Sequence, residues 1–143
     1  MDLSFYEPLY EITADAGVLV RGRSPEELLC NAVLAAVNEM VDLPKVKARE
    51  EVLLGVESAG FPYLLADAVN EVLYLFDSKK FVPKECKVLE LSPDGTKAVL
   101  LLKGETYDPE RHGKKLLLKA ATYHRLEVKK KNGEYEAKVV FDI

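Results

Sequence analysis

The sequence predicts an α+β fold in which two amphipathic helices pack on a largely antiparallel or mixed β-sheet, forming a two-layer domain. Apolar residues recur at the helical period after Ser24-Pro25 and again after Pro62, which predicts the two helices. Strand-like runs and turn signals occupy most of the chain after Phe81, which predicts the sheet. A chain of 143 residues has the length of one domain, so we expect a single domain over residues 1–143.

The start of the first helix has the stronger sequence signal. Ser24 suits the N-cap, Pro25 suits the first helical position, and Glu27 can close a capping box. We expect helices over residues 25–41 and 62–77, each with one apolar stripe and both on the same face of the sheet. The stripes consist of Leu28, Leu29, Ala32, Val33, Ala36, Val37 and Met40, and of Leu64, Leu65, Ala68, Val69, Val72, Leu73 and Phe76.

About seven strands are expected around these helices. Their predicted ranges are 5–12, 17–23, 46–57, 81–91, 96–106, 115–130 and 134–143. Pro8 indicates that the first strand is an edge strand or contains a bulge. Asn132-Gly133 is a strong hairpin signal between the last two strands. Residues 108–113 are predicted to form a polar loop.

Composition excludes several classes of protein. The net charge is −4, and the one basic run, Lys129-Lys130-Lys131, is interpreted as a solvated strand end, so no strong direct binding to nucleic acid is expected. Cys30 and Cys86 are far apart and indicate neither a disulfide framework nor a zinc site. The sequence shows no signal peptide and no apolar run long enough to span a bilayer. We therefore expect a cytoplasmic protein that does not bind membranes.

Asp15 is a lone carboxylate between two apolar strand-like segments. The simpler interpretation is an Asx-type turn, and the alternative is that Asp15 faces a cation. At the other end of the chain, Asp142 lies beside the main-chain carboxylate of Ile143 and should face away from the side that Phe141 joins. If the two ends meet, three carboxylates come together, and such a cluster requires a cation or a bound proton. Oxygen-only clusters suit hard cations such as calcium or magnesium better than zinc.

The two histidines and one helix face are further candidates. His124 shares a predicted strand face with apolar residues, which indicates a buried or half-buried histidine, with a ligand or proton carrier as the alternative. His112 lies in the polar loop shortly after Glu105. The polar stripe of the second helix is either solvated or a docking surface for a basic partner, and its residues are Asp67, Asn70, Glu71 and Tyr74.

Five segments together resemble the archease family, which activates the RtcB-type tRNA-splicing RNA ligase. They are Tyr10-Glu11-Ile12-Thr13-Ala14-Asp15-Ala16-Gly17; Asp67 with Asn70-Glu71 and Tyr74-Leu75-Phe76; Gly104-Glu105 with Asp108 and His112; Lys119-Ala120-Ala121-Thr122-Tyr123-His124; and Asp142-Ile143. The chain departs from the family pattern at Ile12, where the family usually has a histidine, and at Ala16, where it has isoleucine. If that histidine contributes to activity in the family, this chain either has altered activity or uses His124 in its place.

The resemblance implies a single archease-like domain with helices packed on a sheet. It also implies a divalent-metal site formed by Asp15, Asp142 and Ile143, with calcium as the expected metal and magnesium or manganese as alternatives. The implied function is to promote guanylylation and multiple turnover of the ligase in tRNA splicing, without catalysis by the protein itself. Candidates for docking the ligase or supporting the metal ligands are His124, Asp67, Glu71, Glu105 and His112.

Two functions from other classes remain open at this stage. One is a stand-alone metal-dependent phosphoester hydrolase that uses the same carboxylates with His124 as the base. The other is a chaperone-like binding module, although neither helix pattern shows a large exposed apolar stripe. Phosphate-loop and dinucleotide-binding motifs are absent, and neither cysteine has a visible activating partner.

Overall fold

The computed structural model describes residues 1–9 and 16–143, and in these ranges the chain forms helices and two antiparallel sheets. The elements are β1 (Tyr6–Pro8), β2 (Ala16–Gly22), α1 (Pro25–Met40), the 3₁₀ turn η1 (Leu43–Lys45), β3 (Glu50–Glu57), α2 (Tyr63–Lys79), β4 (Phe81–Leu91), β5 (Lys97–Thr106), α3 (Pro109–His112), β6 (Ala120–Lys131) and β7 (Glu134–Asp142). The strand orders are β1-β2-β7-β6 and β3-β5-β4. The predicted α+β class is confirmed. The turn expected between the first two strands falls largely on residues 10–15, which lie outside the described residues.

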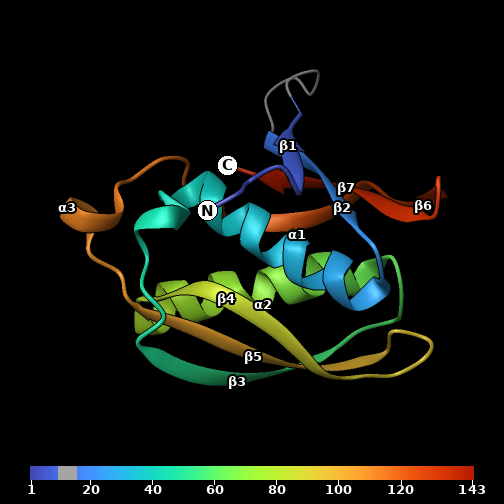
Figure 1. Ribbon diagram of the computed structural model, residues 1–143, viewed down its shortest axis with the longest axis horizontal. Helices are drawn as coiled ribbons and strands as arrows, with labels where there is room; N and C mark the ends of the chain where they lie inside the picture. The colour runs from blue at the N-terminus through green and yellow to red at the C-terminus, as the bar shows by residue number, and fades with distance from the viewer. Residues whose placement is uncertain (10–15) are drawn as a thin grey trace.

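The two long helices lie between the two sheets (Figure 1). Helix α1 contacts β2 and β7 on one side and β4 on the other, and α2 contacts β6, β3 and β4. The sequence predicted one sheet covered on one face, whereas the strands form two sheets with the helices enclosed. This arrangement agrees with helices that are buried on more than one side, since Cys30, Ala35 and Asn38 of α1 are buried outside its predicted stripe.

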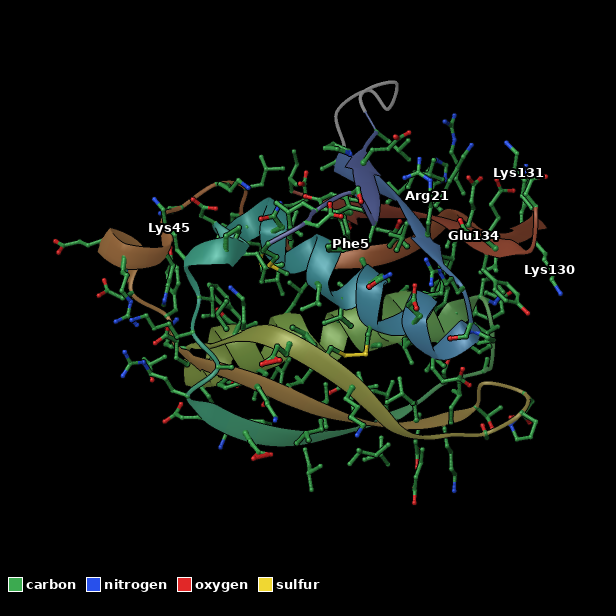
Figure 2. The ribbon with its side chains drawn as sticks, viewed as in Figure 1. Phe5, Arg21, Lys45, Lys130, Lys131 and Glu134 are labelled. Atoms are coloured by element: carbon green, nitrogen blue, oxygen red, sulfur yellow. A yellow bond between two sulfur atoms is a disulfide. The ribbon has the colours of Figure 1, made fainter. Side chains whose placement is uncertain are left out.

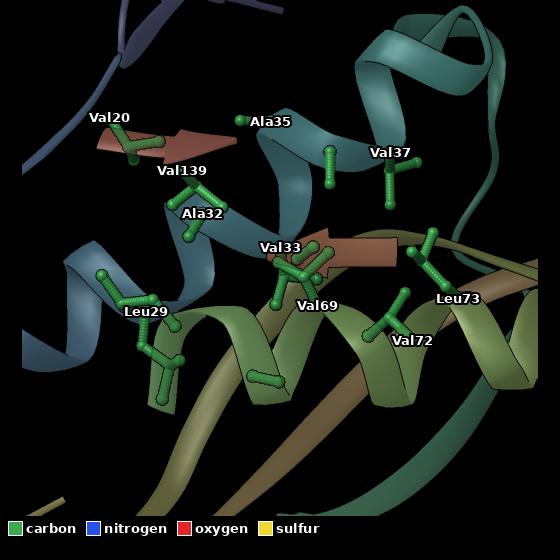
Figure 3. Close-up of a cluster of buried hydrophobic side chains, with 14 of the residues drawn as sticks. Val20, Leu29, Ala32, Val33, Ala35, Val37, Val69, Val72, Leu73 and Val139 are labelled. Carbon is green, nitrogen blue, oxygen red and sulfur yellow. The ribbon is translucent and has the colours of Figure 1, made fainter. Parts of the chain in front are cut away.

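The core forms where the apolar sides of α1 and α2 meet, and Figure 3 shows Leu29, Val33, Val69 and Val72 within it. All four side chains are almost completely buried. Burial of an aliphatic side chain of this size stabilises a fold by about 1.5–3 kcal/mol. The core therefore holds the two helices, and through them the two sheets, in one arrangement.

Helix α1 begins as the sequence predicts. The Ser24 hydroxyl accepts a hydrogen bond from the Glu27 N–H at 3.1 Å, and the Glu27 carboxylate accepts one from the Arg23 N–H at 3.3 Å. The end of the helix is different, because residues 115–119 were predicted to begin a long strand. Instead, the Lys115 N–H donates to the Met40 carbonyl at 2.8 Å and the Leu116 N–H donates to the Glu39 carbonyl at 3.0 Å. These bonds satisfy carbonyl groups that every helix end leaves open, so this segment caps α1 and β6 begins only at Ala120.

The last two strands form the predicted hairpin, with Asn132 at φ 52° and Gly133 at φ 78° in its turn. Its basic run is balanced across the strands, because Lys129 lies opposite Glu136 and Lys131 lies opposite Glu134. Lys131 and Glu134 are labelled near the end of the hairpin in Figure 2. Neighbouring opposite charges of this kind mark a solvated hairpin and not a basic stripe.

Cys30 of α1 and Cys86 of β4 form a disulfide, with 5.4 Å between their Cα atoms and 56 residues of sequence separation. The interpretation that Cys30 and Cys86 indicate no disulfide framework is therefore wrong. Sequence spacing could not reveal the pair, because only the packing of α1 against β4 brings the two residues together. No helix among the described residues is long and apolar enough to cross a bilayer.

Reduction of this disulfide is expected to lower the free energy of unfolding by about 2–4 kcal/mol, since closure of a long loop restricts the unfolded chain. Denaturant unfolding with and without a reducing agent measures the difference. The Cys30→Ser/Cys86→Ser double variant is the control, and it should show no further effect of the reducing agent. Equal unfolding midpoints for the parent in both conditions would show that the disulfide does not form in solution.

Candidate functional site

The beginning of β2 and the end of β7 lie side by side, which brings together two parts of the chain that are far apart in sequence. Ala16 is paired with Phe141, and Gly17 with Val140. Asp15 precedes Ala16 in the sequence and lies outside the described residues. This pairing places Ala16 beside Phe141, a proximity that the sequence alone could not establish.

Asp142 closes β7 with its main chain fixed and its side chain exposed. The Asp142 carbonyl accepts a hydrogen bond from the Lys119 N–H at 2.8 Å, while Phe141 is fully buried. The predicted orientation of Asp142 away from the apolar side is confirmed by its exposure. Ile143 is 47% exposed. Within residues 1–9 and 16–143, no hydrogen bond or ion pair engages the Asp142 carboxylate, so its oxygens remain available to a cation.

The donor groups at this end of the sheet are all oxygens, and such donors suit calcium, magnesium or manganese. The described part of the chain contains no group of three or more histidine, cysteine, aspartate or glutamate side chains that could hold a metal ion. Of the predicted ligands, Asp142 and Ile143 lie within the described residues, whereas Asp15 lies outside them.

Glu105, near the C-terminal end of β5, forms a buried pair with His112 of α3. His112 is fully buried, and its Nε2 lies 2.8 Å from Glu105 Oε2. The His112 Nδ1 accepts a hydrogen bond from the Asp108 N–H at 3.0 Å, so the proton is on Nε2 and is donated to Glu105. Both side chains are buried in this structure, where they bond each other and not the surface. The pair instead holds α3 against β5.

The environment of Glu105 determines its ionisation. Burial alone would raise the pKa of this carboxyl group, but the Lys47 N–H, which donates to Oε2 at 2.7 Å, together with His112 and the Arg111 guanidinium, lowers the pKa below its usual value. Glu105 is therefore a buried carboxylate whose charge is compensated by several donors. A network of this kind commonly serves the fold, and every member must remain paired.

The polar stripe of α2 is only partly exposed, because Asp67 and Asn70 are half-buried and bound to β6. The Asn70 side chain donates to the Ala121 carbonyl at 3.0 Å and accepts from the Ala121 N–H at 2.7 Å. Asp67 accepts a hydrogen bond from the Tyr123 hydroxyl at 2.6 Å, which raises the pKa of Tyr123. Glu71 is exposed, and Tyr74 is 70% exposed. Asn70 thus satisfies the open edge of β6, while the exposed side chains of Glu71 and Tyr74 are accessible to a partner.

A groove of about 470 Å³ lies beside this stripe, between α2 and residues 117–119. Its lining residues are Met40, Asn70, Leu73, Tyr74, Phe76, Asp77, Leu117, Leu118 and Lys119. Leu117 is 66% exposed at the rim. Sequence reasoning missed this groove because it placed residues 115–119 in a strand. The available signal was the run of three leucines, Leu116-Leu117-Leu118, which does not fit strict strand alternation.

His124 lies in a bulge of β6, and its predicted burial is wrong. The strand register shifts between Thr122 and Glu127, and Arg125 has a positive φ of 55°. A bulge interrupts side-chain alternation, so His124 becomes exposed and no longer shares a face with the apolar residues before it. Exposure keeps His124 as a candidate for partner docking.

The His124→Ala variant is expected to keep its stability to within about 0.5 kcal/mol, because the side chain is exposed. If His124 contacts a partner, activation of that partner should fall while the melting temperature stays constant. Thermal melts and an activation assay test both expectations. A large loss of stability would mean that the bulge depends on the imidazole.

The fold and this site define a small α+β protein whose candidate functional groups are an exposed acidic strand end and an exposed helix stripe beside a groove. A sequence model of the Archease protein family (MTH1598/TM1083) matches residues 6–143. The chain belongs to the archease family.

Relatives and solved structures agree with this assignment. The chain is 38% identical over 140 residues to the archease of Methanosarcina mazei, covering 96% of this chain and 95% of that protein. It is 34% identical over 134 residues to the archease of Methanopyrus kandleri, covering 93% and 96%. The solution structure of Methanobacterium thermoautotrophicum protein 1598 matches with a TM-score of 0.74 and 30% identity, over 97% of this chain and 99% of that chain. A Thermotoga maritima crystal structure, described as an archease and possible chaperone, matches with a TM-score of 0.59 and 26% identity, over 96% of each chain.

Proposed function

We propose that this protein is a non-catalytic activator of an RtcB-type RNA ligase in tRNA splicing, and that it promotes guanylylation and multiple turnover of the ligase. The observation that carries the proposal is the pairing of Ala16 with Phe141, which brings the residue after Asp15 beside the strand end that bears Asp142. Family membership supports the proposal, because the resemblance that implies ligase activation covers the same segments. The site of action is the cytoplasm.

Asp15, Asp142 and the main-chain carboxylate of Ile143 are the proposed ligands of a divalent metal, with calcium first and magnesium or manganese as alternatives. A bound cation at such a site supplies positive charge that can stabilise phosphoryl oxygens. The pairing of Ala16 with Phe141 supports this ligand set, because Ala16 follows Asp15 in the sequence and Phe141 precedes Asp142. The exposed Asp142 makes the site accessible to a partner surface.

The proposed docking surface consists of the exposed α2 stripe, the adjoining groove and His124. Glu71 and Tyr74 contribute a charge and an aromatic ring to this surface, and Lys119 lines the groove while its N–H is bonded to Asp142. The surface and the proposed metal site are therefore connected through the main chain at Lys119. Tyrosine is enriched where protein partners bind, and acidic side chains favour a basic partner.

A multiple-turnover ligation assay with the cognate ligase tests this function. The parent protein should raise turnover, and Asp15→Asn should abolish the effect, since it removes one anionic ligand while keeping the size of the side chain. Asp2→Asn makes the same chemical change at an exposed residue near the N-terminus and should leave activation intact. The assay also checks whether Ile12, in place of the usual family histidine, has impaired activity.

Three outcomes would contradict the proposal. Full activation by a folded Asp15→Asn variant would reject the metal site. No activation by the parent would reject the ligase as its partner. Hydrolysis of phosphoesters by the protein and metal without the ligase would favour the hydrolase instead.

A chaperone-like function is the second candidate, and the description of the Thermotoga maritima structure favours it. In this chain, the exposed apolar residues beside the groove are the feature that could bind unfolded segments, with Leu117 the most exposed of its leucines. Suppression of aggregation of an unrelated unfolded protein would support this function. Ligase activation without such suppression would leave the activator as the better description.

A further inference from the structure

Two arginines from different parts of the chain converge on one buried carboxylate oxygen at the α3 end of the molecule. Arg49, just before β3, places its Nε 3.3 Å from Glu105 Oε1. Arg111 of α3 bonds the same oxygen through Nη2. The two guanidinium groups are therefore neighbours, although 62 positions separate them in sequence (111 − 49).

The position of the Glu105 carboxylate is fixed, because its second oxygen, Oε2, bonds groups inside the protein. Oε2 accepts from the Lys47 N–H at 2.7 Å and lies 2.8 Å from His112 Nε2. The carboxylate is buried, whereas the side chains of Arg49 and Arg111 are 58% and 44% exposed. Glu105 thus anchors two partly exposed guanidinium groups at fixed positions.

Each arginine uses only part of its guanidinium group to contact Glu105. Arg49 uses Nε, and across the described residues no hydrogen bond or ion pair engages its two terminal nitrogens. Arg111 bonds Glu105 through Nη2, and within residues 1–9 and 16–143 no hydrogen bond or ion pair engages its Nη1. A planar guanidinium presents its N–H groups as a fork that matches the oxygens of a phosphate. Two guanidinium groups held side by side can donate hydrogen bonds to the same oxyanion.

The local charge is compatible with an anion. Glu105 contributes one negative charge against two guanidinium charges. Exposed Glu50 and Glu110 lie next to the two arginines in sequence, and exposed Lys45 and Lys47 lie shortly before Arg49. Figure 2 labels Lys45 at this end of the molecule. Fixed donor geometry, and not a strongly positive surface, is therefore the feature that would bind the anion.

We propose that Arg49 and Arg111, anchored by Glu105, form a phosphate-binding site. The phosphate could be free or belong to the backbone of an RNA, and both present the same oxygens to the two forks. The site is far smaller than the basic stripe of a dedicated nucleic-acid-binding protein, so binding is expected to be weak and sensitive to salt. This inference does not depend on the proposed ligase function.

The test is a titration of the full chain with inorganic phosphate at constant ionic strength, followed by the side-chain NMR signals of its arginines. A second arm uses a short fluorescently labelled single-stranded RNA and measures anisotropy at low salt. The Arg49→Met variant should weaken binding by roughly tenfold or more, because it removes charge-assisted hydrogen bonds. Arg49→Lys keeps the charge but loses the fork, and it should not restore parental affinity.

Arg23→Met is the matched control, since it removes an exposed arginine before α1 and changes the net charge equally. It should bind phosphate and RNA as the parent does. Binding of inorganic phosphate identifies an isolated anion site. Binding of RNA alone identifies recognition of the RNA backbone. Either result supports the proposal if Arg49→Met weakens the binding. Binding in neither arm overturns it, as does equal weakening by Arg23→Met or full affinity of a folded Arg49→Met or Arg49→Lys.

Discussion

Replacing His112 with alanine is expected to lower the free energy of unfolding by about 3–5 kcal/mol. The imidazole is fully buried, stacks on Tyr107 with 5.9 Å between ring centroids, and bonds through both nitrogens. Its removal leaves a cavity, an unpaired Asp108 N–H and a buried Glu105 carboxylate that has lost a donor. Denaturant unfolding measures the change.

His124→Ala is the matched control, because the chain has two histidines and this one is exposed. The two variants carry the same chemical change and should differ by several kcal/mol in unfolding free energy. Equal stabilities would contradict the burial and bonding described for His112.

The pH dependence of stability provides a second measurement of the same network. The folded pKa of Glu105 is lowered from an ordinary value of 4.5, so its ionisation stabilises the fold above about pH 4.5. That contribution is lost as the pH falls through the lower, folded pKa. Glu105→Gln should therefore be less stable than the parent at neutral pH, and its stability should change less with acidification below pH 4.5. A parallel decline of both proteins would show that other carboxylates govern the acid response.

Extending the chain by one glycine after Ile143 is expected to weaken divalent-metal binding by more than tenfold. The extension converts the proposed carboxylate ligand into a neutral amide and moves the terminal charge roughly 3.3–3.6 Å outward. At an effective dielectric near 20, one charge at ~4 Å contributes about 4 kcal/mol per unit of partner charge before desolvation costs. β7 should remain intact, since Phe141 keeps its buried position and its pairing with Ala16.

Calorimetric titration with calcium or manganese, together with the ligation assay, measures this effect. One glycine added before Met1 is the control, because Met1 is exposed and carries no proposed ligand. Equal metal binding and equal activation by the two extended proteins would exclude the Ile143 carboxylate as a ligand. Asp15 and Asp142 would then need another explanation.

Local patterns were sufficient for most of the secondary structure. Ser24-Pro25 predicted the start of α1, and Asn132-Gly133 predicted the β6–β7 hairpin, since both depend on residues close in sequence. The alternation in β7 also predicted that Phe141 is buried and Asp142 exposed. Periodicity failed in β6, where the bulge at residues 123–126 turns His124 outward and no local residue signals the shift.

The sequence by itself determined the α+β class, the two apolar helices and the acidic character of the candidate metal ligands. Only the tertiary structure decided that the strands form two sheets, that Cys30 pairs with Cys86, and that Ala16 lies beside Phe141. It also revealed that Glu105 is buried and orients Arg49 and Arg111. Propensity and periodicity act between neighbours in the chain. The pairings of Cys30 with Cys86, Arg49 with Glu105 and Ala16 with Phe141 instead join residues 56 or more positions apart, and they form only when the helices are packed between the sheets.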